Sequence, residues 1–210
     1  MIDLKSFSSY PNNLKLIVII PLALLYLLLQ NNDNAQPKNN PETLSQLDNE
    51  SLISKFEGNE VLEEKYKLFE AEGVNRKTSF SKEIIEKVIE TANSFLGVPN
   101  QFGGTTLEGI DASGLVYISI KKHSDLNFPR TSEEMARYGQ IILNPDDLIM
   151  GDLVFFHNTY EIDRIITSVG IYLGNGSFIN SSSSKGVTIS DINDPYYWKS
   201  KFFYGTRIFN

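Results

Sequence analysis

The side chains that could act as nucleophiles in this sequence are serines, because none of its 210 residues is a cysteine. The absence of cysteine excludes disulfides, thiolate metal sites, a cysteine nucleophile and a lipid-modified cysteine. A serine needs a base for activation, and the only histidines are His123 and His157. We interpret His123, in a Lys-Lys-His-Ser run, and His157, at the end of an apolar run, as surface or loop residues.

Metal and cofactor chemistry is not indicated either. Two histidines and no carboxylates at ligand spacing give no recognisable metal site, so we expect neither a metal nor a cofactor. The pair Asp146-Asp147 fits a solvated turn better than a site. Lys and Arg number 19 against 26 Asp and Glu, for a net charge of −7, which argues against a nucleic-acid binder.

The N-terminal residues 1–30 form a targeting or anchoring segment in our interpretation. Fourteen apolar residues, 16–29, follow Lys5 and Lys15. This run is short for a membrane span, which needs about 20 residues, and it fits the apolar region of a secretory signal. A cleaved signal peptide and an uncleaved anchor that contacts the membrane through residues 16–29 both remain open, and a buried soluble helix is a third alternative.

Residues 31–80 are predicted to be a linker followed by a short helical segment. The Asn- and Pro-rich start of this range has too few large apolar side chains to fold. Residues 45–80 carry scattered apolar side chains among charges, which predicts one or two short helices. These helices could form a stalk or pack on the main domain.

Residues 81–210 read as one α+β domain. Apolar residues at helical spacing predict a helix from Ser81 to Leu96, which Gly97 ends. A second apolar stretch covers 115–120, and Thr131 starts a helix that Gly139 ends. Strands are predicted at 153–156, 169–173, 178–180, 187–189 and 204–209, with a hairpin turn at Gly174-Asn175-Gly176. Helices first and strands afterwards indicate an antiparallel sheet.

Several short motifs succeed one another in this domain. They are Gly97-Val98-Pro99 with Phe102-Gly103-Gly104, Gly109-Ile110-Asp111-Ala112-Ser113-Gly114-Leu115-Val116, Pro129-Arg130-Thr131-Ser132, Gly151-Asp152-Leu153-Val154-Phe155-Phe156, Ser168-Val169-Gly170-Ile171-Tyr172-Leu173-Gly174, and Trp198 with Arg207. In this order they resemble the NlpC/p60 family of cell-wall cysteine peptidases. The resemblance implies a papain-like α+β fold, with N-terminal helices packed on an antiparallel β-sheet.

The same resemblance shows where chemistry has been lost. The family's nucleophilic cysteine falls at Ala112, and its base histidine falls at Ser168. The third polar residue of the family falls at Asn180, and a groove-lining tyrosine falls at Asn100. A methyl group cannot attack a carbonyl, and a serine cannot hold a proton as imidazole does near neutral pH. We therefore expect no intact catalytic centre.

A binding groove could outlast catalysis. In papain-like enzymes the nucleophile's backbone N–H helps to form the oxyanion hole, and this donor does not depend on the side chain. The possible groove positions are Asn100, Gly103, Gly104, Asp111, Ser113 and Gly114. The glycines would allow a ligand close to the backbone. For Asp111 a structural role at the helix start is favoured over a functional one.

Three hypotheses arise from these residues. The first is an exported pseudo-peptidase of the bacterial cell envelope, periplasmic or otherwise extracytoplasmic, which binds a peptidoglycan stem peptide or a cell-envelope protein. The second is an active endopeptidase, either as the parent of an engineered Cys-to-Ala form or through Ser113 or Ser168; engineering would explain Ala112 but not Ser168 and Asn100. The third is a structural or assembly module whose groove is plugged, for example by residues 45–80.

Overall fold

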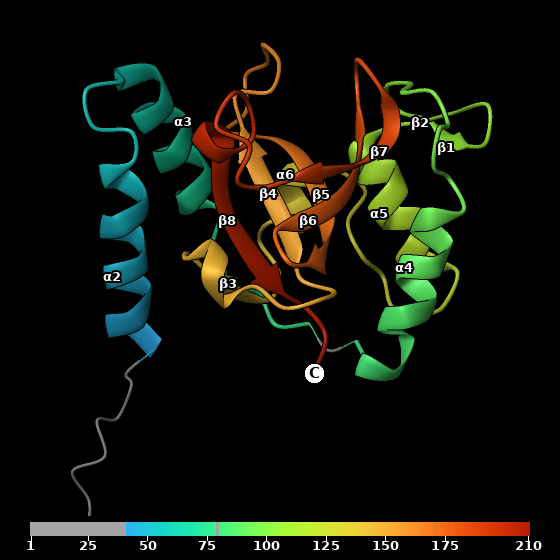
Figure 1. The fold of residues 1–210 in the computed structure, drawn as a ribbon. Helices are drawn as coiled ribbons and strands as arrows, with labels where there is room; N and C mark the ends of the chain where they lie inside the picture. Colours follow the sequence, from blue (N-terminus) through green and yellow to red (C-terminus); the bar gives the residue numbers. More distant parts are fainter. Residues whose placement is uncertain (1–40, 79) are drawn as a thin grey trace, which may run out of the picture. The chain divides into compact units, whose positions relative to one another are not determined.

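The structure, a computed structural model, describes residues 41–78 and 80–210 (Figure 1). Its helices are α2 (Pro41–Ser54), α3 (Glu60–Ala71), η1 (Lys82–Ile84), α4 (Ile85–Asn93), α5 (Ala112–Lys121), α6 (Ser132–Met135), η2 (Pro145–Asp147) and η3 (Lys199–Lys201). Its strands are β1 (Thr105–Thr106), β2 (Gly109–Ile110), β3 (Gln140–Ile142), β4 (Leu153–His157), β5 (Ile166–Gly174), β6 (Ser177–Ser182), β7 (Gly186–Asp191) and β8 (Phe202–Arg207).

The strands β3 to β8 form one antiparallel sheet in the order β3-β8-β4-β5-β6-β7. Strands β1 and β2 form a separate two-stranded pair. The predicted hairpin turn is present, because Asn175 takes a positive φ of 52° between β5 and β6. Helices α4 and α5 pack together, and α5 packs against β5 and β6. The predicted α+β class, with helices on an antiparallel sheet, is confirmed.

The element boundaries differ from the sequence pattern in three places. The helix expected from Ser81 to Leu96 is a 3-10 turn followed by α4, which ends at Asn93. The helix that starts after Thr131 ends at Met135, well before Gly139. Strand β3 was not predicted, because three residues carry too little periodicity. The two helix differences lie at the ends of elements, where hydrogen bonds with neighbouring segments decide the backbone conformation.

The sheet buries side chains on both faces. Phe155 and Val169 belong to a large apolar cluster that also contains Leu115 of α5. Phe156 belongs to a smaller cluster with Trp198. Because successive residues of a strand point to opposite faces, the adjacent phenylalanines of β4 serve different clusters. Burial of both faces fixes the register of the central strands, and so fixes where the loops between them begin and end.

Residues 45–78 pack on the rest of the described chain, as one of our two expected arrangements had it. The span Ser45–Asn210 is one compact unit. The ring centroids of Phe56 and Tyr66 lie 5.6 and 5.9 Å from that of Phe203 in β8. Figure 1 shows α3 at the end of the sheet near β8, and α4 and α5 at the other end, near β7. The helical segment therefore adds to the core.

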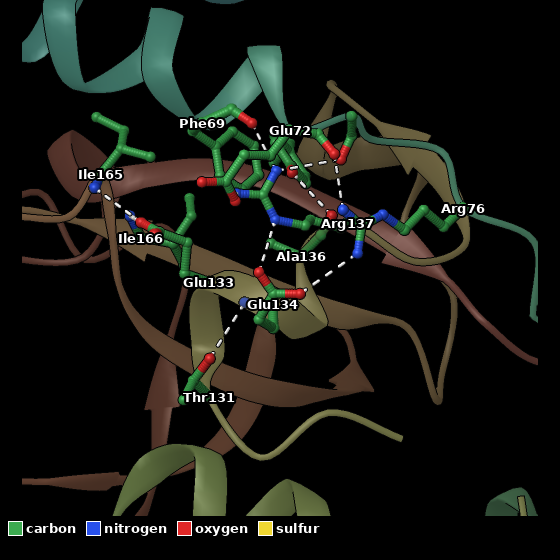
Figure 2. A network of polar contacts seen from close by, with 12 residues as sticks. Phe69, Glu72, Arg76, Thr131, Glu133, Glu134, Ala136, Arg137, Ile165 and Ile166 are labelled. Atoms are coloured by element: carbon green, nitrogen blue, oxygen red, sulfur yellow. Dashed lines mark hydrogen bonds and ion pairs between the residues drawn. The ribbon is translucent and has the colours of Figure 1, made fainter. Parts of the chain in front are cut away.

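A buried arginine fastens this segment (Figure 2). Arg137 is 1% exposed, and its guanidinium lies 2.7 Å from Glu72 and 3.0 Å from Glu134. It also donates hydrogen bonds to the backbone carbonyls of Phe69 and Gly73. A buried guanidinium is tolerated only where its donors are paired, so this network fixes the end of α3 against α6.

The predicted N-terminal signal or anchor, residues 1–30, lies outside the described residues. Among the helices in the described ranges, none combines the length and the apolar character that a bilayer crossing requires.

Candidate functional site

Ala112 is the first residue of α5 and is partly buried against the larger apolar cluster. The first N–H groups of a helix have no partner inside it, and the helix dipole makes this end attractive to negative charge. The position could therefore stabilise a thiolate or an oxyanion. The side chain present is a methyl group, which can do neither acid–base nor nucleophilic chemistry.

Asp111 caps this helix and also forms the centre of a polar network. One carboxylate oxygen accepts hydrogen bonds from the Gly114 N–H at 2.6 Å and from the Ser113 hydroxyl at 3.1 Å. The other oxygen accepts from the Gly103 N–H at 2.6 Å. Arg130 pairs with both oxygens, at 2.9 and 3.1 Å. These bonds connect the glycine loop, the start of α5 and the loop before α6, which agrees with a structural role for Asp111.

Two glycines allow these segments to approach each other closely. A Cβ at Gly114 would lie 2.3 Å from the Gly104 carbonyl oxygen, and a Cβ at Gly104 would lie 2.3 Å from that of Gly109. The backbone of the chain itself therefore occupies the space beside both residues. Gly103 differs, because its φ is +75° and nothing lies within 4 Å of its Cβ position.

The other positions matched to the family's catalytic residues lie on the strands that α5 contacts. Ser168 lies on β5 and is 6% exposed, and Asn180 lies on β6 and is fully buried. The next residue, Ser181, donates its hydroxyl to the Ile110 carbonyl at 2.7 Å, just before the start of α5. Asn100 donates its amide to the Ser181 hydroxyl at 2.9 Å. The structure thus brings Asn100 and the Asn180-Ser181 segment to the start of α5.

Asn180 carries an unsatisfied polar group. Its side-chain oxygen accepts a long hydrogen bond from Ser190 at 3.4 Å. Its amide nitrogen is buried and has no hydrogen-bond partner among the described residues. A buried donor without a partner costs about 1–3 kcal/mol, so the Asn180 amide destabilises this part of the sheet.

No histidine lies at this site within the described ranges. The imidazole of His123 lies 2.8 Å from the Thr91 hydroxyl of α4. His157 lies between aromatic rings, 5.2 Å from Phe56 and 6.4 Å from Phe203. Burial, followed by the charges of Lys201 and Lys55, lowers the pKa of His157 to about 4. His157 is therefore less exposed than we expected, and it contacts the helical segment instead of α5.

Ser113 is engaged in the frame of the site. Its hydroxyl donates to Asp111 and accepts a hydrogen bond from Arg130 at 2.8 Å. Both groups that the hydroxyl contacts are already paired with each other, and no imidazole contacts the hydroxyl. The geometry therefore gives Ser113 a fixed orientation and no effective base.

Arg130 and Ser181 were not identified as site residues from the sequence. Arg130 is part of the Pro-Arg-Thr-Ser motif, but the motif alone does not predict that Arg130 pairs with Asp111. Ser181 lies one residue after Asn180, and nothing in the local pattern signals its hydrogen bonds to Asn100 and Ile110.

Known proteins resemble the part of the chain that holds these residues. The profile of the NlpC/P60 family matches residues 97–207. Over 134 residues the chain is 37% identical to the probable endopeptidase NlpC of Escherichia coli, a match that covers 64% of this chain and 84% of that protein. Over 126 residues it is 32% identical to the murein DD-endopeptidase MepS/murein LD-carboxypeptidase of the same species, covering 60% of this chain and 64% of that protein.

Other relatives are considerably longer than the matched region. The chain is 41% identical over 115 residues to a gamma-DL-glutamyl hydrolase of Bacillus subtilis, which covers 54% of this chain and 27% of that protein. The solved structure of a family protein from Bacillus cereus matches with a TM-score of 0.52 and 29% identity over 59% of this chain and 40% of that one. A lipoprotein-like family member from Staphylococcus aureus matches with a TM-score of 0.55 and 27% identity over 63% and 44%.

Proposed function

The chain belongs to the NlpC/P60 family, and from that premise we propose that it is a non-hydrolysing member that binds cell-wall peptide or a partner protein. The observation that carries the proposal is the combination of Ala112 at the first position of α5 with Ser168 on the adjacent strand β5. A peptidase of this kind needs a nucleophile and a base. The Ala112 side chain supplies no nucleophile, and the Ser168 side chain supplies no base. The relatives named as endopeptidases suggest cell-wall peptide as the ligand class.

The frame that would position a ligand is retained. The pair of Asp111 with Arg130 holds the glycine loop against the start of α5. The backbone N–H groups at that helix start do not depend on the side chain at position 112, so they could still bind a peptide carbonyl or carboxylate. Retention of an ordered frame after loss of the reacting groups supports binding over hydrolysis.

An active serine centre has less support. Ser113 is bound by Asp111 and Arg130, and both histidines contact other parts of the described chain. Without a base a serine hydroxyl is a poor nucleophile, and residual activity would fall by orders of magnitude.

A plugged groove filled by residues 45–80 also has less support. Within the described part of that segment, Phe56 and Tyr66 contact β8, and Arg137 holds the end of α3. These contacts lie at the β8 end of the sheet, whereas α5 lies at the other end, near β7 (Figure 1). An assembly role through another surface remains compatible with a non-hydrolysing domain.

We place the protein in the bacterial cell envelope, outside the cytoplasm. The support is the substrate implied by the names of its relatives together with the signal- or anchor-like run at residues 16–29. Residues 81–210 would then be the exported binding domain, with 31–80 connecting and bracing it.

Calorimetry tests the binding proposal. Peptidoglycan stem peptides titrated into the full chain should give saturable heat in the micromolar to millimolar range, and Arg130→Ala should weaken it by disordering the glycine loop. A matched control is Lys121→Gln, which changes a charge at the far end of the same helix. Absence of heat at millimolar peptide would remove the peptide-binding proposal and leave a protein partner as the ligand.

A further inference from the structure

A concave region lies where the α2–α3 turn meets the sheet. This α2–α3 cavity has a volume of about 580 Å³, and its lining includes Lys55, Phe56, Asn59, His157, Lys199 and Phe202. Such a volume is in the range of small-molecule sites. Several lining residues precede residue 97, where the family match begins, so the helical segment creates this cavity.

One part of the cavity wall is apolar and rigid. Phe56 is 2% exposed, and its ring centroid lies 5.6 Å from that of Phe203 and 5.2 Å from that of His157. Phe202 is 9% exposed, and Leu62 and Leu143 complete this wall. Rigid aromatic and aliphatic walls favour the apolar body of a ligand, because no side chain must be ordered on binding.

The charged groups at the cavity are mostly cationic. Lys55 donates to the Phe203 carbonyl at 2.6 Å, and its ammonium lies 5.5 Å from the Phe202 ring centroid. An ammonium has three N–H donors, so two remain for a ligand. Lys199 also lines the cavity, and Glu57 is the one acidic side chain among its lining residues. The remaining donors favour an anion.

His157, which also lines the α2–α3 cavity, has a ring nitrogen without a hydrogen-bond partner in the part of the chain that the structure describes. The Nδ1 atom of His157 is buried and has no hydrogen-bond partner among the described residues. The charges that surround this imidazole are the ammonium groups of Lys55 and Lys201. The ring also lies within hydrogen-bond reach of the Ser200 backbone, and a neutral imidazole has one N–H. With that proton on Nδ1, the ring would donate a hydrogen bond beside the Lys55 ammonium.

We propose that the α2–α3 cavity binds a small organic anion: an apolar or aromatic body that carries one carboxylate or phosphate group. The anionic group would lie between Lys55 and His157, and the body would lie against Phe56 and Phe202. This site is separate from the start of α5, so it does not rest on the proposed function. It would make the helical segment a ligand-binding part of the protein as well as a brace.

The ring signals of the two histidines can report directly on ligand binding in the α2–α3 cavity. In the full chain with ¹⁵N-labelled histidine, two sets of ring signals report on His157 inside the cavity and on His123 beside Thr91. Benzoate and phenyl phosphate are the probes, and uncharged benzamide is the matched control. We expect saturable shifts of the His157 signals with benzoate or phenyl phosphate, little change with benzamide, and no change at His123.

Variants of the cationic residues complete the test. Lys55→Gln should weaken the binding of the effective probe by roughly tenfold, because one charge-assisted hydrogen bond is lost. Unchanged His123 signals show that the Lys55→Gln variant is folded. If that variant is not folded, Lys199→Gln is used in its place. The proposal is overturned if His157 does not respond at millimolar benzoate or phenyl phosphate, if benzamide acts equally, or if both histidines shift together.

Discussion

Replacing Asp111 by alanine should destabilise the domain more than loss of an ordinary surface carboxylate does. The carboxylate caps α5 through the Gly114 N–H, holds the Gly103 N–H and pairs with both terminal nitrogens of Arg130. Its side chain is 16% exposed and that of Arg130 is 32% exposed, so water can replace these contacts only in part. The substitution therefore removes three roles at once.

The expected size comes from those roles. Loss of a helix N-cap costs about 1 kcal/mol. Breaking a fully buried ion pair costs about 3–5 kcal/mol, and the exposure of Arg130 reduces this to about 1–2 kcal/mol. The unpaired Gly103 N–H adds a fraction of a kcal/mol, because it lies at the surface. The total is about 2–4 kcal/mol, a large part of the usual 5–15 kcal/mol of domain stability.

Urea unfolding followed by tryptophan fluorescence can measure this loss. Trp198 is the only tryptophan, is 8% exposed, and lies in the smaller apolar cluster away from Asp111. Its signal therefore reports global unfolding, and far-ultraviolet circular dichroism provides a second probe. Asp111→Asn is the matched control: it keeps an acceptor for the Gly114 N–H but loses the charge, so we expect an intermediate loss.

A double-mutant cycle with Arg130→Ala isolates the pair. We expect a coupling energy of about 1–2 kcal/mol, since each residue is the main partner of the other. A loss below about 0.5 kcal/mol for Asp111→Ala, or additive single losses, would refute the view that this network forms the frame of the site.

The other predictions concern separate parts of the chain. Gly114→Ala should cost about 1–3 kcal/mol in urea unfolding, because its Cβ would lie 2.3 Å from a backbone oxygen; a neutral effect would contradict the packing described. Arg137→Met should expose residues 45–78 to limited proteolysis before the sheet unfolds, since it removes the contacts with the end of α3; Arg137→Lys should be milder, and equal resistance of all three proteins would refute it. His157 has a pKa of about 4 against 6.5 in the unfolded chain, so the unfolded state binds more protons and stability falls as pH drops from 6.5 towards 4, by up to about 3 kcal/mol; His157→Gln should lose this part of the pH dependence, and an unchanged profile would count against it. Ala112→Cys combined with Ser168→His should give slow peptidoglycan cleavage that neither single variant shows, and cleavage by either single variant would contradict the need for both groups.

Much of the fold was predictable because its signals are local. The apolar runs of β4 and β5 and the Gly174-Asn175-Gly176 turn predict a hairpin-rich sheet without knowledge of contacts. The extra strand β3 was not predictable, because its pairing with β8 joins residues far apart in the sequence. The choice between a stalk and a packed segment at 45–80 depended on long-range contacts with Phe203 that no local pattern encodes.

At the site, too, features set by local sequence were predictable and long-range contacts were not. The motif around Ala112 indicates a helix start, and Asp111 as its cap can be predicted from residue type and position. The pairing of Asp111 with Arg130, and the hydrogen bonds of Ser181 with Asn100 and Ile110, were not predictable. Each joins segments whose distance is set by the packing of α5 on the sheet. The assignment of Ser168 and Asn180 as degenerate positions remains a proposal.

The central claim is that this protein binds cell-wall peptide or a partner protein without hydrolysing peptidoglycan, and digestion of purified peptidoglycan tests the absence of hydrolysis most directly. The full chain is incubated with peptidoglycan for days beside an active relative, and released fragments are separated and identified by mass spectrometry while bound protein is measured by co-sedimentation. We predict that the chain co-sediments and releases no fragments above the protein-free control. Fragments whose yield rises with protein concentration, and disappears in Ser113→Ala or Ser168→Ala, would contradict the account.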